Sequence, residues 1–259
     1  MANTIGYGQG AVNNTNSWGQ GAKIGSSFSN IYSTDYDGID AHISTDATYS
    51  ELDGQTKATF SLWVKPTSFA VSRMLFSITK DTTAGNSQVM LYVDTSARLR
   101  GFVSTGSKYI YTNTSVLTIN TWHHILFCVD LTQVLVANRG RIFVDGIDQT
   151  ATGYSQLNET IFPTSNSELF IAEDKNGFLN PFLNNMDEFA IWSGTDLRDD
   201  VATIYNSGVP NDLNDNGLTA PTSWYRFEEG SGTTISDSGS STNNATIQNS
   251  VTFETDVPT

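Results

Sequence analysis

The chain has 259 residues, of which 38% are hydrophobic and only 15% are charged. A chain of this length can bury a substantial core and forms one large domain or two small ones. Its formal net charge of −14 repels phosphates and anionic lipids, which excludes nucleic acid and membrane surfaces as partners.

The first 30 residues contain one short phrase twice, since YGQGA at 7–11 returns as WGQGA at 18–22. This Gly- and Asn-rich segment has no apolar run of a signal peptide and cannot build a core of its own. We expect an extended arm over residues 1–30 whose repeated side chains anchor it in a partner. A disordered tail is the alternative. The side chains expected to bind the partner are Tyr7, Gln9, Trp18 and Gln20.

Short apolar or alternating runs, separated by Gly, Asn, Asp and Ser, follow the arm and predict a β sandwich or jelly roll. The lone cysteine, Cys128, lies in an apolar run, which predicts a buried thiol. Strands are expected near 36–44, 57–65, 72–80, 87–94, 97–105, 108–113, 122–130, 139–145, 167–173, 185–193, 222–228 and 244–249.

One helix is expected over residues 197–206, capped by Thr195 or Asp196 and ended by Gly208 and Pro210. Its spacing gives a single apolar face, so we expect it to cover an edge or one end of the sandwich. That face consists of Leu197, Val201, Ile204 and Tyr205.

Four motifs, in order, resemble those of laminin-G-like domains. They are TFSLWVKP at 59–66, TWHHI at 121–125, RIFVDG at 141–146, and NMDEFAIW at 185–192 with IYN at 204–206. The resemblance implies an all-β, concanavalin-A-like jelly roll of two antiparallel sheets, each of six or seven strands. It also implies that Trp63, Trp122, Trp192 and Trp224 are core residues.

The phrase WYRFEEGSGTT at 224–234 resembles the usual opening of such a domain, although here it closes the chain. Because chain ends lie close together in this fold, we expect strands over 222–250 to complete one jelly roll spanning 31–259. Residues 207–221 would then be the crossing loop.

Catalysis is not expected. A retaining glycosidase needs two carboxylates about 5–5.5 Å apart. Glu51 and Asp53 lie in a predicted loop, and the adjacent Asp187 and Glu188 should point to opposite faces of a strand.

The sequence contains two groups of candidate metal ligands. His123 and His124 are adjacent on a predicted strand, so we expect one to be packed and one exposed instead of sharing an ion. DLNDNG at 212–217 matches the start of a calcium loop, with ligands Asp212, Asn214 and Asn216, although Ser223 replaces the bidentate glutamate. A structural calcium ion and a solvated acidic turn both remain open there. The resemblance also makes Asp37 and Asp187 calcium candidates, since they lie in motifs where some relatives keep a calcium ion.

Five aromatic residues are candidates for a carbohydrate site on loops or an exposed sheet face, with core packing as the alternative. They are Phe69, Tyr109, Tyr111, Phe178 and Phe182.

The arm also loosely resembles the N-terminal segments of virion proteins in tailed phages. We therefore predict a non-catalytic structural and adhesive protein of a phage particle. Its arm would bind other virion proteins, and its jelly roll would decorate a capsid or fibre or contact host surface glycans, with homo-oligomers left open. The alternative is a carbohydrate-binding module of a secreted or cell-surface bacterial protein.

Overall fold

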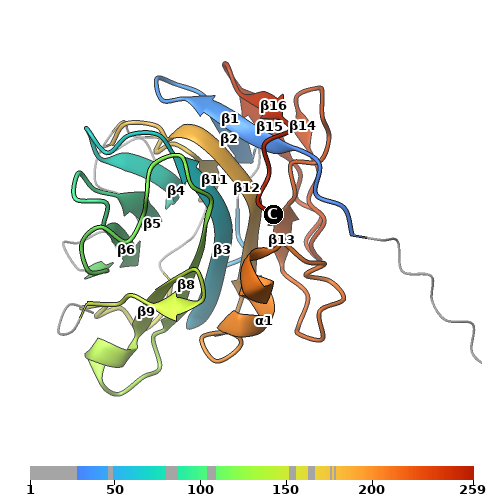
Figure 1. Cartoon of the computed structure of the whole chain (residues 1–259). Coiled ribbons are helices and arrows are strands. Elements are labelled where there is room, and N and C mark those ends of the chain that lie inside the picture. Colours follow the sequence, from blue (N-terminus) through green and yellow to red (C-terminus); the bar gives the residue numbers. More distant parts are fainter. Residues whose placement is uncertain are drawn as a thin grey trace, which may run out of the picture.

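The computed structural model describes residues 28–45, 49–79, 87–103, 109–151, 156–162, 167–175, 177 and 179–259, apart from the side chains of 87 and 88. Two antiparallel sheets pack face to face (Figure 1), which confirms the predicted jelly roll. Each sheet has eight strands instead of six or seven. Three of the additional strands are only two or three residues long, too short for a periodic pattern to reveal. The fourth arises because the strand expected over 36–44 is two strands, Ser33–Asp37 and His42–Thr45, which belong to different sheets.

The first sheet has the order β10-β9-β8-β3-β12-β1-β16, and β13 also pairs with β12. Its strands are β10 (Ile147–Asp148), β9 (Gly140–Val144), β8 (His123–Asp130), β3 (Lys57–Pro66), β12 (Leu183–Ser193), β1 (Ser33–Asp37), β16 (Thr252–Glu254) and β13 (Ser223–Tyr225).

The second sheet has the order β14-β15-β2-β11-β4-β5-β6-β7. Its strands are β14 (Thr234–Ile235), β15 (Ala245–Gln248), β2 (His42–Thr45), β11 (Glu168–Ile171), β4 (Arg73–Thr79), β5 (Ser87–Val93), β6 (Leu99–Val103) and β7 (Tyr109–Tyr111). The C-terminal strands β13 and β15 pair with β12 and β2, so the end of the chain contributes to both sheets.

The main core fills the space between the two sheets. Alternate residues of each strand point into it, as Phe60 does from β3 and Phe127 from β8. The ring of Phe60 lies 4.9 Å from that of Phe76 and 5.7 Å from that of Phe127. Burying side chains of this size contributes about 1.5–3 kcal/mol each.

The helix α1 (Val201–Tyr205) is shorter than expected and continues into a 3₁₀ turn, η2 (Asn206–Gly208). Asp196 accepts from the backbone N–H of Arg198, in a turn that precedes the helix, so it does not cap α1. The helix ends at Asn206, whose φ of 47° is left-handed. None of the described helices has the length and apolar character needed to cross a membrane.

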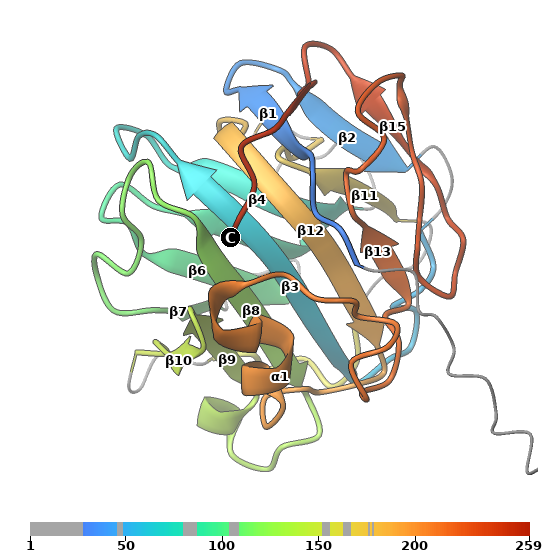
Figure 2. The same cartoon turned by 45° about the vertical axis from the view of Figure 1, so that its right-hand side comes forward.

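The helix lies against the outer face of the first sheet, over β3 and β8 (Figure 2), and the expectation that it covers an edge or one end was wrong. Leu197 and Ile204 form a second, smaller core there with side chains of the sheet. The sheet contributes Leu126, Cys128, Phe143, Ala190, Trp192 and Trp224 to it. The predicted burial of the Cys128 thiol is therefore confirmed, and burial raises its pKa.

Three of the four family tryptophans, Trp63, Trp192 and Trp224, are buried, but under this outer layer and not between the sheets. Trp122 is only half-buried, and its indole N–H donates to Asp256 Oδ1 at 3.0 Å.

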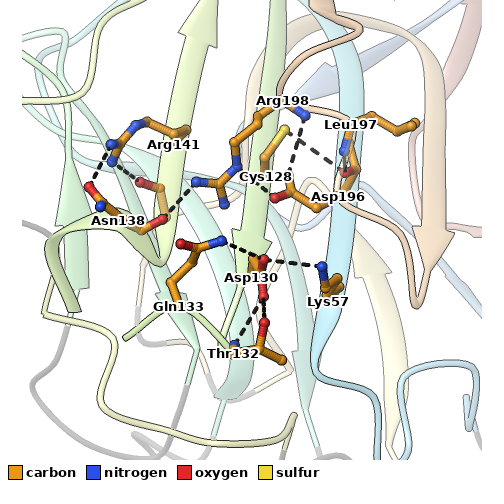
Figure 3. A network of polar contacts seen from close by, with 12 residues as sticks. Lys57, Cys128, Asp130, Thr132, Gln133, Asn138, Arg141, Asp196, Leu197 and Arg198 are labelled. Carbon is orange, nitrogen blue, oxygen red and sulfur yellow. Dashed lines mark hydrogen bonds and ion pairs between the residues drawn. The ribbon is translucent and has the colours of Figure 1, made fainter. Parts of the chain in front are cut away.

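A polar network closes the end of the first sheet (Figure 3). The carboxylate of Asp130, at the end of β8, accepts from the backbone N–H of Thr132 at 3.0 Å and from Gln133 Nε2 at 2.9 Å. It also lies 3.2 Å from Lys57 Nζ. These donors outweigh the effect of burial and lower the pKa of Asp130 to about 2.

Replacing Asp130 by asparagine is expected to lower the free energy of unfolding at pH 7 by about 1–2 kcal/mol. Because the folded-state pKa is depressed, this stabilisation is present above the unfolded-state pKa and is lost as pH falls toward 2. Urea unfolding of both proteins at pH 7 and pH 2.5 measures it. A difference as large at pH 2.5 as at pH 7 would contradict this assignment.

Candidate carbohydrate-binding face

Aromatic side chains gather on the outer face of the second sheet, over β5, β6 and β7. We call this set, Tyr92, Phe102, Tyr109 and Tyr111, the aromatic face; all four side chains are half-buried. The ring centroids of Tyr92 and Phe102 lie 5.8 Å apart, those of Phe102 and Tyr109 5.3 Å, and those of Tyr109 and Tyr111 5.7 Å. The four rings therefore form one continuous row on the surface.

Strand register produces this row. Leu99 and Val103 of β6 point into the core, so Arg100 and Phe102 point outward. Phe102 pairs with Met90 of β5 and with Tyr109 of β7. Arg100 pairs with Tyr92 and Tyr111 in the same way, so two adjacent cross-strand rows share the face.

Two arginines and one aspartate complete the face. The guanidinium carbon of Arg98 lies 5.3 Å from the ring centroid of Tyr111, and that of Arg100 lies 5.6 Å from the centroid of Tyr109. Both Nε atoms donate to Asp94 Oδ2 at 3.0 Å. Hydrogen bonds, including those from the backbone N–H groups of Ser96 and Arg98, outweigh burial and hold the pKa of Asp94 below its usual value.

Only part of this face was predicted. Tyr109 and Tyr111 were named as carbohydrate candidates, whereas Tyr92 and Phe102 were missed. The alternation in Leu99-Arg100-Gly101-Phe102-Val103 was a usable signal for an outward Phe102. Of the other candidates, Phe182 is fully buried, Phe69 packs against the core, and Phe178 lies outside the described residues.

The other predicted site residues lie elsewhere. Tyr7, Gln9, Trp18 and Gln20 fall outside the described residues, so their partner binding stays a prediction. The described end of the arm contacts the same chain. The ring of Phe28 stacks on that of Trp224, with the two centroids 6.3 Å apart.

The 212–217 loop lies between η2 and β13. Asp212 Oδ1 accepts from the backbone N–H of Asn214, and Asn216 Oδ1 accepts from that of Leu218, both at 3.0 Å. Asn214 donates its side-chain N–H to the carbonyl of Ser238. A calcium ion at this loop would bind side-chain oxygens that already accept backbone hydrogen bonds within it. Calcium binding stays a prediction.

The carboxylate pair of β12 does not follow the expected alternation. A β-bulge separates Asp187 from Ala190, and Glu188 has a φ of 49°. Asp187 pairs with Trp63, and Glu188 lines the same small cavity as Trp63, so both lie on the outer side of the sheet. The expectation that these carboxylates point to opposite faces was wrong.

Both carboxylates are nevertheless enclosed. Asn30 Nδ2 donates to Asp187 Oδ2 at 2.9 Å, and Trp224 Nε1 donates to Glu188 Oε2 at 2.6 Å. Arg226 Nε lies 3.3 Å from Glu188 Oε1. Burial raises the pKa of Asp187 well above its usual value and that of Glu188 to about 8.

The buried pair predicts a pH dependence of stability. A carboxyl group whose pKa is raised by folding contributes most below its unfolded-state pKa, and this contribution is lost as pH rises through the folded-state pKa. The free energy of unfolding should therefore fall by on the order of 1–3 kcal/mol between pH 5 and pH 9. In Glu188→Gln part of that fall should disappear, because the buried Asp187 still titrates, whereas the exposed Asp199→Asn should retain all of it. Urea unfolding at pH 5, 7 and 9 measures the slope, and a wild-type stability that rises over this range would contradict it.

The two adjacent histidines face opposite sides, but both are buried, and the expectation of one exposed ring was wrong. His124 pairs with Trp63 on the outer side, and its Nε2 lies 2.8 Å from Ser61 Oγ. His123 Nε2 accepts from the backbone N–H of Thr118 at 2.9 Å, so its Nδ1 donates to Asp145 Oδ2 at 2.7 Å.

A hollow of about 240 Å³ lies near the β16 edge of the first sheet, between β1, β12 and β16. It is lined by Asp35, Asn184, Asn185, Glu254 and Asp256. Burial and the neighbouring Glu254 raise the pKa of Asp35. These polar groups could bind hydroxyl groups, but the hollow has no aromatic lining on which a sugar ring could stack.

Solved structures share this fold at low sequence identity. A candidate carbohydrate-binding protein from Bacteroides ovatus ATCC 8483 has a TM-score of 0.64 and 17% identity over 89% of this chain, which spans 62% of that protein. The heptameric SAP-like pentraxin of Limulus polyphemus has a TM-score of 0.56 and 14% identity, covering 87% of this chain and 95% of its own. The extracellular region of zebrafish Gpr126/Adgrg6 has a TM-score of 0.55 and 13% identity, over 88% of this chain and 26% of that one.

A comparison with curated proteins found no match. The model of one family, however, matches residues 37–202, which is more than half of the chain and includes the first three motifs and the NMDEFAIW part of the fourth. The chain therefore belongs to the concanavalin A-like lectin/glucanase superfamily, as a laminin-G-like member.

Proposed function

We propose that this protein is a non-catalytic carbohydrate-binding module that takes its glycan on the aromatic face. The observation that carries the proposal is the continuous row of four half-buried rings, with two guanidinium groups beside it. Sugar rings present C–H groups that pack on aromatic surfaces and hydroxyl groups that bind charged side chains. A protein leaves such a contiguous aromatic patch in solvent mainly where it binds something.

The burial and the hydrogen bonds of the carboxylates support a binding role and not catalysis. Asp187 and Glu188 are buried, and their oxygens are engaged by Asn30, Trp224 and Arg226. Asp94, the carboxylate on the aromatic face, is held by two arginines. We propose an extracellular place of action, on a secreted or cell-surface protein, where polysaccharides are accessible.

The test is a screen of the purified chain against immobilised polysaccharides, neutral and acidic, with calcium and with a chelator. Dissociation constants between about 1 mM and 1 μM are expected for at least one class of glycan. A screen that stays flat under both conditions would overturn the proposal. A response that disappears with the chelator would direct attention to the 212–217 loop.

The role in a phage particle stays a prediction, because the arm residues that carry it lie outside the described residues. None of the three solved structures named above is a virion protein. A density gradient of the source culture's lysate tests the role, since a virion component would band with DNA-containing particles in fixed ratio to a capsid protein.

A further inference from the structure

The aromatic face carries more positive charge than its place in this chain would suggest. Among the residues that the structure describes on this face, Arg98 and Arg100 contribute two positive charges against the single negative charge of Asp94, although the whole chain has a net charge of −14. Both arginine side chains remain about a quarter exposed, at 25% and 23%. The face is therefore a locally cationic spot on a strongly acidic protein.

Asp94 contacts each of the two guanidinium groups through its Nε atom only. Its Oδ2 accepts from the Nε of each guanidinium, while its Oδ1 accepts from the backbone N–H groups of Ser96 and Arg98. A guanidinium has five N–H donors, and the pair of Nη groups lies on the side away from Nε. Among the contacts described, Tyr92 also shares a side-chain hydrogen bond with Arg100. Donors therefore remain on both guanidiniums.

The Nη donors that remain suit one ligand chemistry in particular. Two parallel N–H donors match the two oxygens of a carboxylate, or two oxygens of a sulfate ester, and such charge-assisted pairs are about twice as strong as neutral hydrogen bonds. The guanidinium of Arg100 lies 5.6 and 5.7 Å from the ring centroids of Tyr109 and Tyr111. Because this guanidinium lies over both rings, a sugar packed against the row next to it would have its anionic substituent beside the guanidinium.

We infer that the glycan bound by the aromatic face is anionic and carries uronate carboxylates or sulfate esters, which Arg98 and Arg100 bind. This inference rests on the proposed function. Asp94 is a positioning residue that fixes both guanidiniums without touching the sugar. The net charge of the chain repels a polyanion at long range, so recognition depends on these short-range contacts, and tests belong at physiological salt, where the Debye length is about 8 Å.

The experiment compares two matched pairs of polysaccharides by isothermal titration at about 0.15 M salt. Polygalacturonate is set against its methyl ester, and dextran sulfate against dextran. At least tenfold tighter binding of one acidic member than of its neutral partner is expected, and the pair that shows it identifies carboxylate or sulfate as the group recognised. Equal affinity within both pairs would overturn the inference and leave the proposed function standing. If the chain binds neither these four probes nor any glycan of the screen, both the inference and the proposed function are overturned.

Variants locate the recognition. Arg100→Gln should weaken binding of the acidic polysaccharide about tenfold or more and leave that of the neutral partner unchanged, with Arg98→Gln acting in the same direction. Arg100→Lys keeps the charge but loses the fork, so an intermediate affinity is expected. Arg141→Gln, on β9 of the first sheet, is the matched control and should bind as the wild type does. If both arginine-to-glutamine variants melt like the wild type and retain full affinity for the acidic probe, the inference fails.

Discussion

Replacing Phe127 by alanine is expected to lower the free energy of unfolding by about 3–5 kcal/mol. The ring is fully buried in the main core and lies 5.7 Å from the ring of Phe60. On its other side it lies against Gly101 of β6, where a Cβ atom would come within 2.6 Å of Phe127 Cζ. The ring therefore fills the space beneath the strand that carries Arg100 and Phe102, and its removal leaves a cavity there.

Urea unfolding at pH 6 measures this loss, with the slope of the transition as a check on two-state behaviour. Phe127→Leu is the graded control and should lose less. Gly101→Ala should destabilise by about 1–3 kcal/mol through overpacking, and combining it with Phe127→Leu should lose less than the sum, because the smaller side chain makes room. A loss below about 1 kcal/mol for Phe127→Ala would show that the two sheets do not pack as described.

Replacing Phe102 by alanine is expected to weaken glycan binding at least tenfold, which corresponds to about 1.4 kcal/mol or more. Its ring is central in the aromatic face, since it contacts both Tyr92 and Tyr109. Its removal interrupts the row and also releases the ring of Tyr109 from one neighbour. Because Phe102 points outward, the fold should lose much less stability than in Phe127→Ala.

Titration with the tightest-binding polysaccharide of the screen measures the effect. Trp122→Ala is the matched control, because it removes a half-buried aromatic that directly precedes β8 of the first sheet and contacts Asp256. Unchanged affinity in Phe102→Ala, or an equal loss in Trp122→Ala, would place the glycan site elsewhere.

The fold could be predicted from the sequence because its motifs lie on long, regular strands. β3, β8 and β12 are eight to eleven residues long, and each carries a tryptophan or histidine motif within a run of apolar residues. Three strands that the sequence does not reveal are two or three residues long and exist only through their pairing with neighbours. The strand expected over 36–44 is two strands, β1 and β2, because the chain passes from one sheet to the other after Gly38, whose φ of 72° is left-handed. The helix begins later than expected because Asp196 stabilises a turn and not the helix start.

The site was less predictable because it depends on register between strands and on one irregularity. Tyr109 and Tyr111 could be named from their position, but Tyr92 joins them only because β5 and β7 both pair with β6. The rule that adjacent strand residues face opposite sides failed at Glu188, where the bulge turns the backbone into a left-handed conformation. Nothing in a two-residue period reveals such a bulge.

Glycan binding on the aromatic face is tested most directly by mapping glycan contacts on the whole chain by nuclear magnetic resonance. Backbone amide shifts would be followed while an oligosaccharide from the tightest-binding polysaccharide is added. We expect the largest shifts on 90–93, 98–103 and 109–112, the strands of the aromatic face. Shifts concentrated at the hollow between β1, β12 and β16 would contradict it, as would the absence of any shift at saturating ligand.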